Sequence, residues 1–172
     1  MKIVGITGNL TRPSKTRALC EHLVNLLSQH GGSGRCFDLL DAMPGLGNTI
    51  WRSEAPAEVD ALLLEIEQAD ILVVGSPVYK ASYTGMLKHL FDLLDMKALV
   101  SKSVVAFSTG KATAHAEQVE AHFRSLFTFF EARMPGRFIY AVDQDFEAGL
   151  PGPNLTALVD QEIRRVLKDS GK

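Results

Sequence analysis

Short apolar runs alternate with longer amphipathic segments along the chain, and this alternation constrains the fold more than any other feature. The runs are mostly branched or aromatic and do not alternate with polar residues, which is typical of strands covered on both faces. We predict four buried strands and a weaker edge strand: Ile3–Thr7, Ile71–Gly75, Val104–Ser108 and Phe138–Val142, with Arg35–Leu39 at the edge.

The segments between and after these runs carry apolar residues at helical spacing, which predicts five helices. Gly31 is expected to end the first helix, and the fourth is expected to start near Thr113. The predicted apolar faces are Leu19, Leu23, Leu26 and Leu27; Val59, Leu62, Leu63 and Ile66; Leu87, Leu90, Phe91 and Leu94; Val119, Phe123, Leu126, Phe127 and Phe130; and Leu155, Leu158, Val159, Ile163, Val166 and Leu167.

Strict alternation of strands and helices requires parallel strands, right-handed crossovers and helices on both faces of the sheet. Five such strands suit a doubly wound α/β fold in the order 2-1-3-4-5, with three α/β/α layers, which is the flavodoxin-like arrangement. The chain contains no repeat, low-complexity stretch or linker, so we expect a single domain over residues 1–172.

Charge and cysteine content narrow the function classes. The formal net charge is −2 and the basic residues are scattered, so nucleic acid is not an expected partner. No apolar run reaches the length of a membrane span, and none at the start resembles a signal peptide, which makes the cytoplasm the expected location. Cys20 and Cys36 lack the spacing of metal ligands and are predicted to be free thiols, with Cys20 on the packed face of the first helix.

Residues 41–56 form the one long irregular segment of the chain. Segments of this length without secondary structure are commonly functional, so we interpret it as either an active-site flap or a subunit contact. Ile50 and Trp51 are large apolar residues within it, so we expect part of this segment to be buried.

Ligands of a doubly wound sheet bind at the carboxyl ends of the strands, near the point where the strand order reverses. The first loop at this edge, TGNLTRPSKTR over residues 7–17, crowds hydroxyls, an amide, a glycine and two arginines before a helix. Backbone N–H groups, hydroxyls and a helix N-terminus hold phosphate in this way. Because the loop matches neither GxGxxG nor a P-loop, we predict a phosphate monoester site. The alternative is a plain helix cap by Ser14 or Thr16.

Two further loops reach the same edge. Residues 75–85, GSPVYKASYTG, place a proline and two tyrosines after a buried strand, which suits a flat ring that needs apolar area and a few directed hydrogen bonds. Residues 108–115, STGKATAH, follow the next strand, and the glycine there allows a backbone to approach a ligand closely.

Together these segments resemble the NADPH-dependent FMN reductases of the flavodoxin-like superfamily, in particular the small reductases that supply reduced flavin to sulfonate-degrading monooxygenases. The resemblance covers about residues 1–170 and rests on GNLTRPSKT, STGKATAH and, most specifically, GSPVYKASYTGMLK. It implies FMN as the flavin, NADPH or NADH as the hydride donor, and a homodimer or homotetramer. The implied FMN contacts are Asn9, Arg12, Ser14 and Thr16 at the phosphate, Pro77, Val78, Tyr79 and Lys80 along the isoalloxazine, Thr109, Gly110 and Lys111 at the far end of the ring, and Tyr83 and Thr84 near the mouth.

The function implied by this resemblance is hydride transfer from NAD(P)H to FMN, with the reduced flavin passed to a partner monooxygenase. The flavin itself carries this chemistry, so we predict no catalytic acid or base. The alternatives are a reductase with tightly bound FMN acting on quinones, azo dyes or chromate, and a flavodoxin-type electron carrier. A receiver-type signalling domain is disfavoured, because Gly8-Asn9 stands where its acidic cluster would lie.

Two positions depart from the family pattern. Asn9 replaces the usual serine, and we expect it still to present donors to a phosphate. Lys111 replaces a second glycine, and a cation there would either stabilise the reduced flavin or meet the NADPH phosphate.

The helix after the third loop carries two histidines and several aromatic residues. His122 is the candidate for a π-bulge that some of these reductases place at a tetramer interface. His115 and His122 lack a clear carboxylate partner, so no metal site is predicted. Four phenylalanines are predicted to offer more apolar surface than one core needs: Phe123, Phe127, Phe129 and Phe130.

Overall fold

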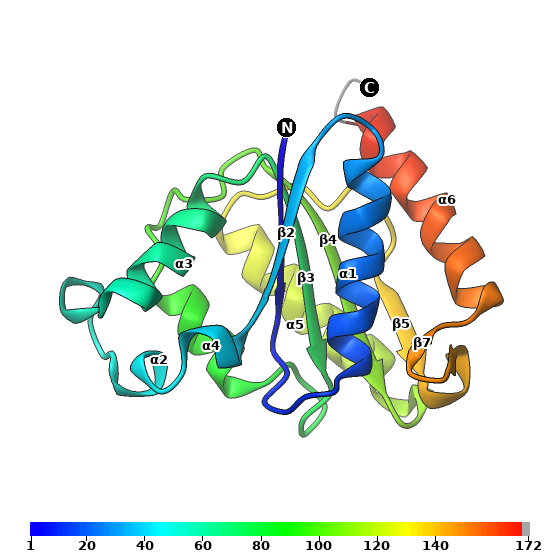
Figure 1. Ribbon diagram of the computed structural model, residues 1–172, viewed down its shortest axis with the longest axis horizontal. Helices are drawn as coiled ribbons and strands as arrows, with labels where there is room; N and C mark the ends of the chain where they lie inside the picture. The colour runs from blue at the N-terminus through cyan, green and yellow to red at the C-terminus, as the bar shows by residue number, and fades with distance from the viewer. Residues whose placement is uncertain (170–172) are drawn as a thin grey trace.

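A five-stranded parallel sheet forms the centre of the computed structural model, which describes residues 1–169 (Figure 1). The strands pair in the order β2-β1-β3-β4-β5, so the predicted order 2-1-3-4-5 is confirmed. The last three residues of the predicted domain lie outside the described residues. The strands are β1 (Lys2–Thr7), β2 (Ser33–Asp38), β3 (Ile71–Pro77), β4 (Ser103–Gly110) and β5 (Ile139–Val142).

The five predicted helices are present, together with shorter elements that periodicity does not reveal. No helix among residues 1–169 has both the length and the apolar composition that crossing a membrane requires. The predicted helices are α1 (Lys15–Ser28), α3 (Ala57–Glu67), α4 (Gly85–Asp92), α5 (Ala116–Phe129) and α6 (Pro153–Asp169). The shorter elements are α2 (Gly45–Asn48), the hairpin β6 (Phe146–Glu147) and β7 (Leu150–Pro151), and the 3-10 turns η1 (Leu39–Ala42), η2 (Arg52–Glu54), η3 (Thr113–His115) and η4 (Asp143–Asp145).

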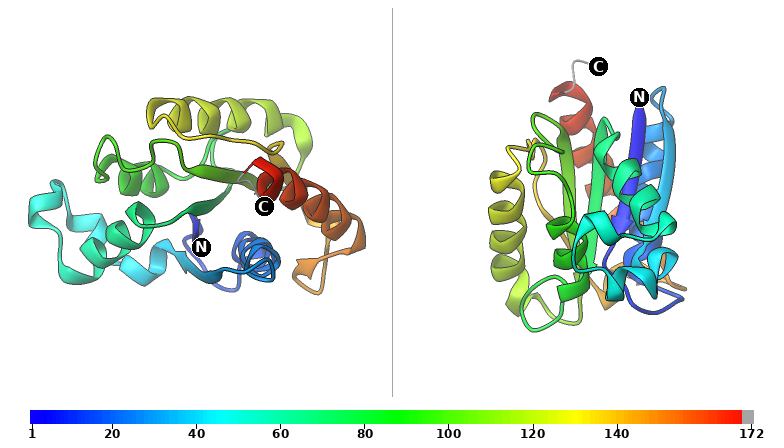
Figure 2. Two further views of the ribbon diagram at one scale, coloured as in Figure 1. Left: turned by 90° about the horizontal axis from the view of Figure 1, so that it is seen from above. Right: turned by 90° about the vertical axis from the view of Figure 1, so that its left-hand side faces the viewer.

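Helices cover both faces of the sheet, with α1 and α6 on one side and α3, α4 and α5 on the other (Figure 2). Successive side chains of a strand point to opposite faces, so each strand supplies two cores. In β1, Ile3 joins the core under α1 and α6, whereas Val4 and Ile6 join the other. Because both faces of a central strand are covered, its sequence is a continuous apolar run. Cys20 is fully buried on α1 as predicted, and both cysteines are free thiols.

Two predictions about helix faces are wrong, and so is one about the geometry of α5. Leu158 was placed on the packed face of α6, but it is 47% exposed while its neighbour Val159 fills the core. Three of the four aromatic residues assigned to excess surface are buried, because Phe127 and Phe130 pack against Phe91 and Phe123 stacks on Phe127. Phe129 alone of the four is exposed. α5 is an unbroken α-helix without a π-bulge at His122, and it begins at Ala116 after a 3-10 turn.

Residues 41–56 leave their two large apolar side chains uncovered within the single chain, so neither side chain belongs to its core. Ile50 is 70% exposed and Trp51 is 67% exposed. Leu46 of α2 fills the core instead, and Arg52 anchors the segment through ion pairs to Asp60 and Glu67.

Gly75 of β3 leaves room for a large aromatic ring on one face of the sheet. It pairs with Phe107 of β4, whose ring is fully buried. A Cβ atom at Gly75 would lie 1.9–2.4 Å from three atoms of that ring. Because Phe107 sits in a close-packed core, it has no free volume into which it could move.

We therefore expect Gly75→Ala to lower the free energy of unfolding by about 3 kcal/mol, the upper range for overpacking. The measurement is urea unfolding of the flavin-free chain, followed by circular dichroism. Gly85→Ala is the matched control, because a Cβ there meets no atom within 4 Å. Equal stabilities of the two variants would contradict this account.

Candidate functional site

The loops that follow β1, β3 and β4 meet at one edge of the sheet (Figure 1). Parallel strands in register place their carboxyl ends together: Thr7 of β1 lies beside Gly75 of β3, and Pro77 of β3 lies beside Thr109 of β4. The three loops predicted to bind the ligand are thus brought together.

The first loop leads from β1 into the N-terminus of α1. Ser14 is the helix N-cap, and its hydroxyl accepts a hydrogen bond from the N–H of Arg17 at 3.3 Å. The capping alternative for Ser14 is therefore realised, and it leaves the hydroxyl hydrogen available as a donor. The N–H groups at the start of a helix have no partner within the helix, so those that Ser14 does not cap are available to an anion.

Asn9 and Arg12 are engaged within the protein. The amide oxygen of Asn9 accepts from the Thr7 hydroxyl at 2.7 Å, and its Nδ2 donates to the Thr11 carbonyl and to Asp38. Both amide hydrogens are thus used, and any contact of Asn9 with a phosphate falls to its backbone N–H. Arg12 donates through Nε and Nη2 to Asp38 and through Nη2 to Asp41.

Asp38 is a buried carboxylate at the end of β2, and the sequence analysis did not single it out. Its side chain is inaccessible to solvent, and it accepts hydrogen bonds from Asn9, Arg12 and Arg17. Two features of the sequence could have identified it: an acidic residue at the end of the predicted edge strand, and two arginines in the first loop that would need a partner.

The second loop contains a tight, strained turn. Tyr79 and Ser82 exchange backbone hydrogen bonds of 2.8 and 3.1 Å across Lys80 and Ala81. Both central residues have positive φ, 52° and 62°, which disfavours residues other than glycine. Strain of this kind persists where the surroundings fix it and is concentrated at ligand sites. Pro77 and Val78 before the turn are half-buried, whereas Tyr79 and Lys80 are exposed.

The third loop is tied to the first by a pair of hydroxyls. Thr16 of α1 and Thr109 of β4 lie 2.6 Å apart, oxygen to oxygen. The Val78 N–H donates to the Thr109 carbonyl at 2.9 Å, so the second loop joins the same assembly. Tyr140 donates to the carbonyl of Ala112 at 2.7 Å and supports the loop from β5.

A second set of buried bonds joins the first two loops. The N–H of Gly8 donates to the Gly75 carbonyl, and the Gly8 carbonyl accepts from the Thr84 hydroxyl, both at 2.8 Å. The Ser76 hydroxyl accepts from the Thr84 N–H at 3.0 Å. A Cβ at Gly8 would lie 2.6 Å from Thr84 Oγ1, so only glycine permits this approach. Thr84 thus holds the loops together from within, rather than lying at the mouth.

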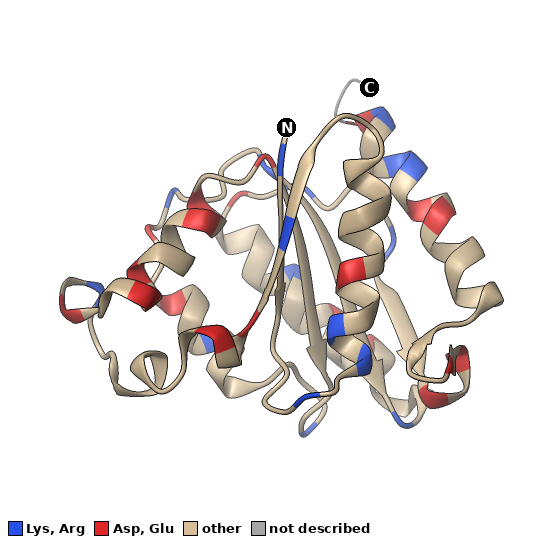
Figure 3. Cartoon of the chain, viewed as in Figure 1, with Lys and Arg blue, Asp and Glu red and all other residues tan. Residues whose placement is uncertain are grey.

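Basic segments lie along the edge where the strands end (Figure 3). Lys15 is paired with Asp143 at 2.9 Å, and Arg12 and Arg17 are paired with Asp38 and Asp41. Within residues 1–169, no ion pair involves Lys80 or Lys111, and both are exposed. These two lysines are therefore free to meet an anionic ligand.

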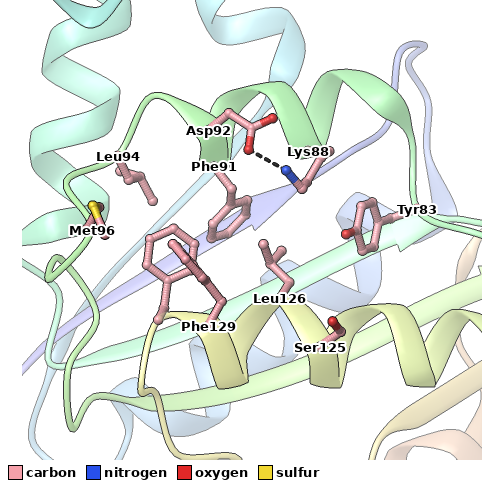
Figure 4. Close-up of a pocket in the computed structure, with 10 residues that line it drawn as sticks. Tyr83, Lys88, Phe91, Asp92, Leu94, Met96, Ser125, Leu126 and Phe129 are labelled. Carbon is pink, nitrogen blue, oxygen red and sulfur yellow. Dashed lines mark hydrogen bonds and ion pairs between the residues drawn. The ribbon is translucent and has the colours of Figure 1, made fainter.

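Cavities lie beside the loops and elsewhere on the molecule. One of about 330 Å³ is lined by Lys111 and by residues 142–144, and one of about 510 Å³ lies between the first loop and the β6–β7 hairpin. A separate cavity of about 450 Å³ lies between α4 and α5, where Phe91, Leu126 and Phe129 face one another and Tyr83 lies at one end (Figure 4). This last cavity is away from the strand ends, so we do not assign it to the flavin.

The two histidines of the α5 region do not face the same way along a helix. His115 belongs to the 3-10 turn before α5, and His122 packs edge-on toward Tyr83, with ring centroids 6.3 Å apart. Over residues 1–169 there is no group of three or more His, Cys, Asp or Glu side chains that could hold a metal ion.

Solved structures place the chain in a fold class. An archaeal flavodoxin superposes with a TM-score of 0.68 at 12% sequence identity, over 97% of this chain and 99% of that chain. An apo NADH:FMN oxidoreductase (EmoB) superposes with a TM-score of 0.86 at 26% identity, over 98% of this chain and 89% of that chain. The fold is flavodoxin-like, and the ligand-binding edge of that class coincides with the three loops described above.

The family follows from sequence. The family model for NADPH-dependent FMN reductase matches residues 1–147. An FMN reductase (NADPH) of Pseudomonas aeruginosa is 43% identical, and an NADH-dependent FMN reductase, SfnF, of Pseudomonas fluorescens is 42% identical; each alignment covers 85% of this chain and 79% of the relative. The chain belongs to the NADPH-dependent FMN reductase family.

The environment of Asp38 predicts how stability responds to acid. Burial alone would raise the pKa of the Asp38 carboxyl, but hydrogen bonds from Arg12, Arg17 and Asn9 outweigh it and lower the pKa to about 2. The folded-state pKa is thus below the ordinary carboxyl value of about 4, so the carboxylate stabilises the fold above that pH. This contribution is lost as the pH falls toward 2.

We expect the wild-type chain to lose about 1–2 kcal/mol more unfolding free energy than Asp38→Asn between about pH 5 and pH 2.5, in urea titrations. The two stability curves should converge at low pH. Glu21→Gln, which removes the exposed partner of Arg17, serves as the control and should keep the wild-type slope. Parallel curves for wild type and Asp38→Asn would contradict the assignment.

Proposed function

We propose that this chain is an NAD(P)H-dependent FMN reductase that transfers hydride from the nicotinamide to FMN. The observation that carries the proposal is the joining of three loops at the carboxyl edge of the sheet by buried and partly buried hydrogen bonds, in a chain of the FMN reductase family. The relatives named for reducing FMN with NADPH or NADH support both the flavin and the donor.

The residues present fit FMN. The start of α1 offers N–H groups and the Ser14 hydroxyl to a phosphate, and Thr16 with Thr109 closes the loop behind it. Pro77 and Val78 offer apolar surface to a flat ring, and the rigid turn at Lys80–Ala81 offers backbone groups to its polar edge. When bound, the flavin supplies the hydride chemistry, and the chain binds and orients the two reactants.

The wider role is also part of the proposal. Reduced FMN is released to a partner flavin-dependent monooxygenase, as the resemblance to reductases of sulfonate-degrading systems implies. The exposure of Tyr79, Lys80 and Lys111 supports release of the flavin, because these side chains are accessible to water at the candidate ring site.

We further propose a homodimer or homotetramer and a cytoplasmic location. The exposed Ile50, Trp51 and Phe129 support a contact between subunits.

The test is steady-state oxidation of NADPH and of NADH by desalted protein, with FMN, FAD, riboflavin or no flavin added. We expect nearly colourless protein, and oxidation that rises and saturates with FMN. Yellow protein that responds to quinones or dyes but not to added flavin would favour the reductase with tightly bound FMN. Binding of FMN without consumption of nicotinamide would contradict the enzyme and favour an electron carrier.

Lys111 gives a sharper prediction about the nicotinamide. It is exposed and carries no ion pair, so it can reach a phosphate that lies in water at the site mouth. We expect Lys111→Gln to raise the KM for NADPH by about threefold to tenfold, with a smaller change for NADH, as loss of one charge-assisted contact implies. Lys97→Gln is the control, an exposed lysine beyond the end of α4. A fall in kcat with both donors and unchanged KM would instead assign Lys111 to the reduced flavin.

A further inference from the structure

Asp38 links the start, the middle and the end of the first loop. It ends β2 and pairs in register with Thr7, the last residue of β1. Its carboxylate is fully buried beside the strand edge. A buried carboxylate is costly unless it is paired and fully hydrogen-bonded, so its partners should be well ordered.

The carboxylate of Asp38 bonds to three separate points of the first loop and to one backbone N–H beyond β2. Oδ2 accepts from Asn9 Nδ2 at 3.1 Å, from Arg12 Nε at 2.7 Å and from Arg17 Nη1 at 2.8 Å. Oδ1 accepts from Arg12 Nη2 at 2.6 Å and from the N–H of Leu40 at 3.0 Å. The two Arg12 bonds form a bidentate pair, which fixes orientation as well as distance.

We propose that Asp38 is a positioning residue for the flavin phosphate, holding the first loop in its binding shape before the flavin arrives. This inference rests on the proposed function. The N–H groups and the Ser14 hydroxyl that would hold the phosphate lie between Asn9 and Arg17, so anchoring those two residues and Arg12 fixes the donors in between. Ordering a loop in advance removes its entropic cost from the binding step.

The effect of charge on phosphate binding can be distinguished from the effect of losing the loop anchor. Arg12 and Arg17 are balanced by Asp38 and Asp41. Removing the negative charge of Asp38 would leave the loop more positive, and charge alone would then tighten the binding of a phosphate dianion. Loss of the loop anchor would weaken it. The two explanations therefore predict changes of opposite sign.

The experiment measures the Kd of FMN and of riboflavin for the full flavin-free chain, by quenching of flavin fluorescence. Riboflavin has the same ring and no phosphate, so the ratio of the two Kd values isolates the phosphate contribution. We expect Asp38→Asn to raise the Kd of FMN by about tenfold and that of riboflavin by less than about twofold. A purely structural role would change both alike.

Two further variants complete the design. Glu67→Gln breaks a comparable bidentate pair, with Arg52, away from the loops and should leave the Kd ratio unchanged even if it lowers stability. Arg17→Lys keeps the charge at a partly exposed site but loses the planar guanidinium, whose Nη1 donates to both Asp38 and Asp41 while its Nε donates to Glu21. It therefore serves if Asp38→Asn does not fold. It should raise the Kd of FMN selectively by about threefold.

The proposal is overturned if FMN binds Asp38→Asn as tightly as wild type or more tightly, or if both flavins weaken equally. If Asp38→Asn does not fold, an unchanged Kd ratio in Arg17→Lys overturns it. Failure of the proposed function has a different signature, because wild type would then bind neither flavin, or would bind FMN no better than riboflavin.

Discussion

The parallel sheet depends on being covered on both faces, and most of the structure follows from that requirement. Its strands send apolar side chains in both directions, so α1 and α6 on one side and α3, α4 and α5 on the other must each present an apolar face. Gly75 shows how tight the fit becomes, because only a residue without a side chain leaves room for the Phe107 ring on that face of the sheet. Connections that must return across the sheet bring the carboxyl ends of the strands to one edge, where polar loops are free of the core.

At that edge the structure is held by buried polar contacts rather than by apolar packing. Gly8, Thr84 and Ser76 join two of the loops, and Thr16 with Thr109 joins the third. Each bond lies where water is largely excluded, so breaking one would leave a costly unpaired group. The hydrogen bonds that join the loops are therefore well protected, while several side chains of the same loops are exposed. This combination suits a site that takes up and releases a small ligand.

Much of the fold could be predicted because the determinants are local. The apolar runs gave the strands within a few residues, and the spacing of leucines in residues 19–27 gave α1. The errors fall where neighbours distant in sequence decide burial. Leu158 and Val159 are adjacent and both apolar, and only the position of α6 on the sheet selects which one is covered. In the same way, residues 41–56 bury Leu46 and leave Trp51 exposed within the single chain, although both are large and apolar.

The sequence by itself determined the class of fold, the three loops at one edge and the resemblance to FMN reductases, since periodicity and motifs are properties of neighbouring residues. Only the tertiary structure decided what the polar residues of those loops do. Asn9 and Arg12 look like phosphate ligands in the sequence, yet the fold directs their side chains to Asp38. The physical reason is that β2 and the first loop are distant along the chain. Pairing of β1 with β2 alone brings the carboxylate to the two donors.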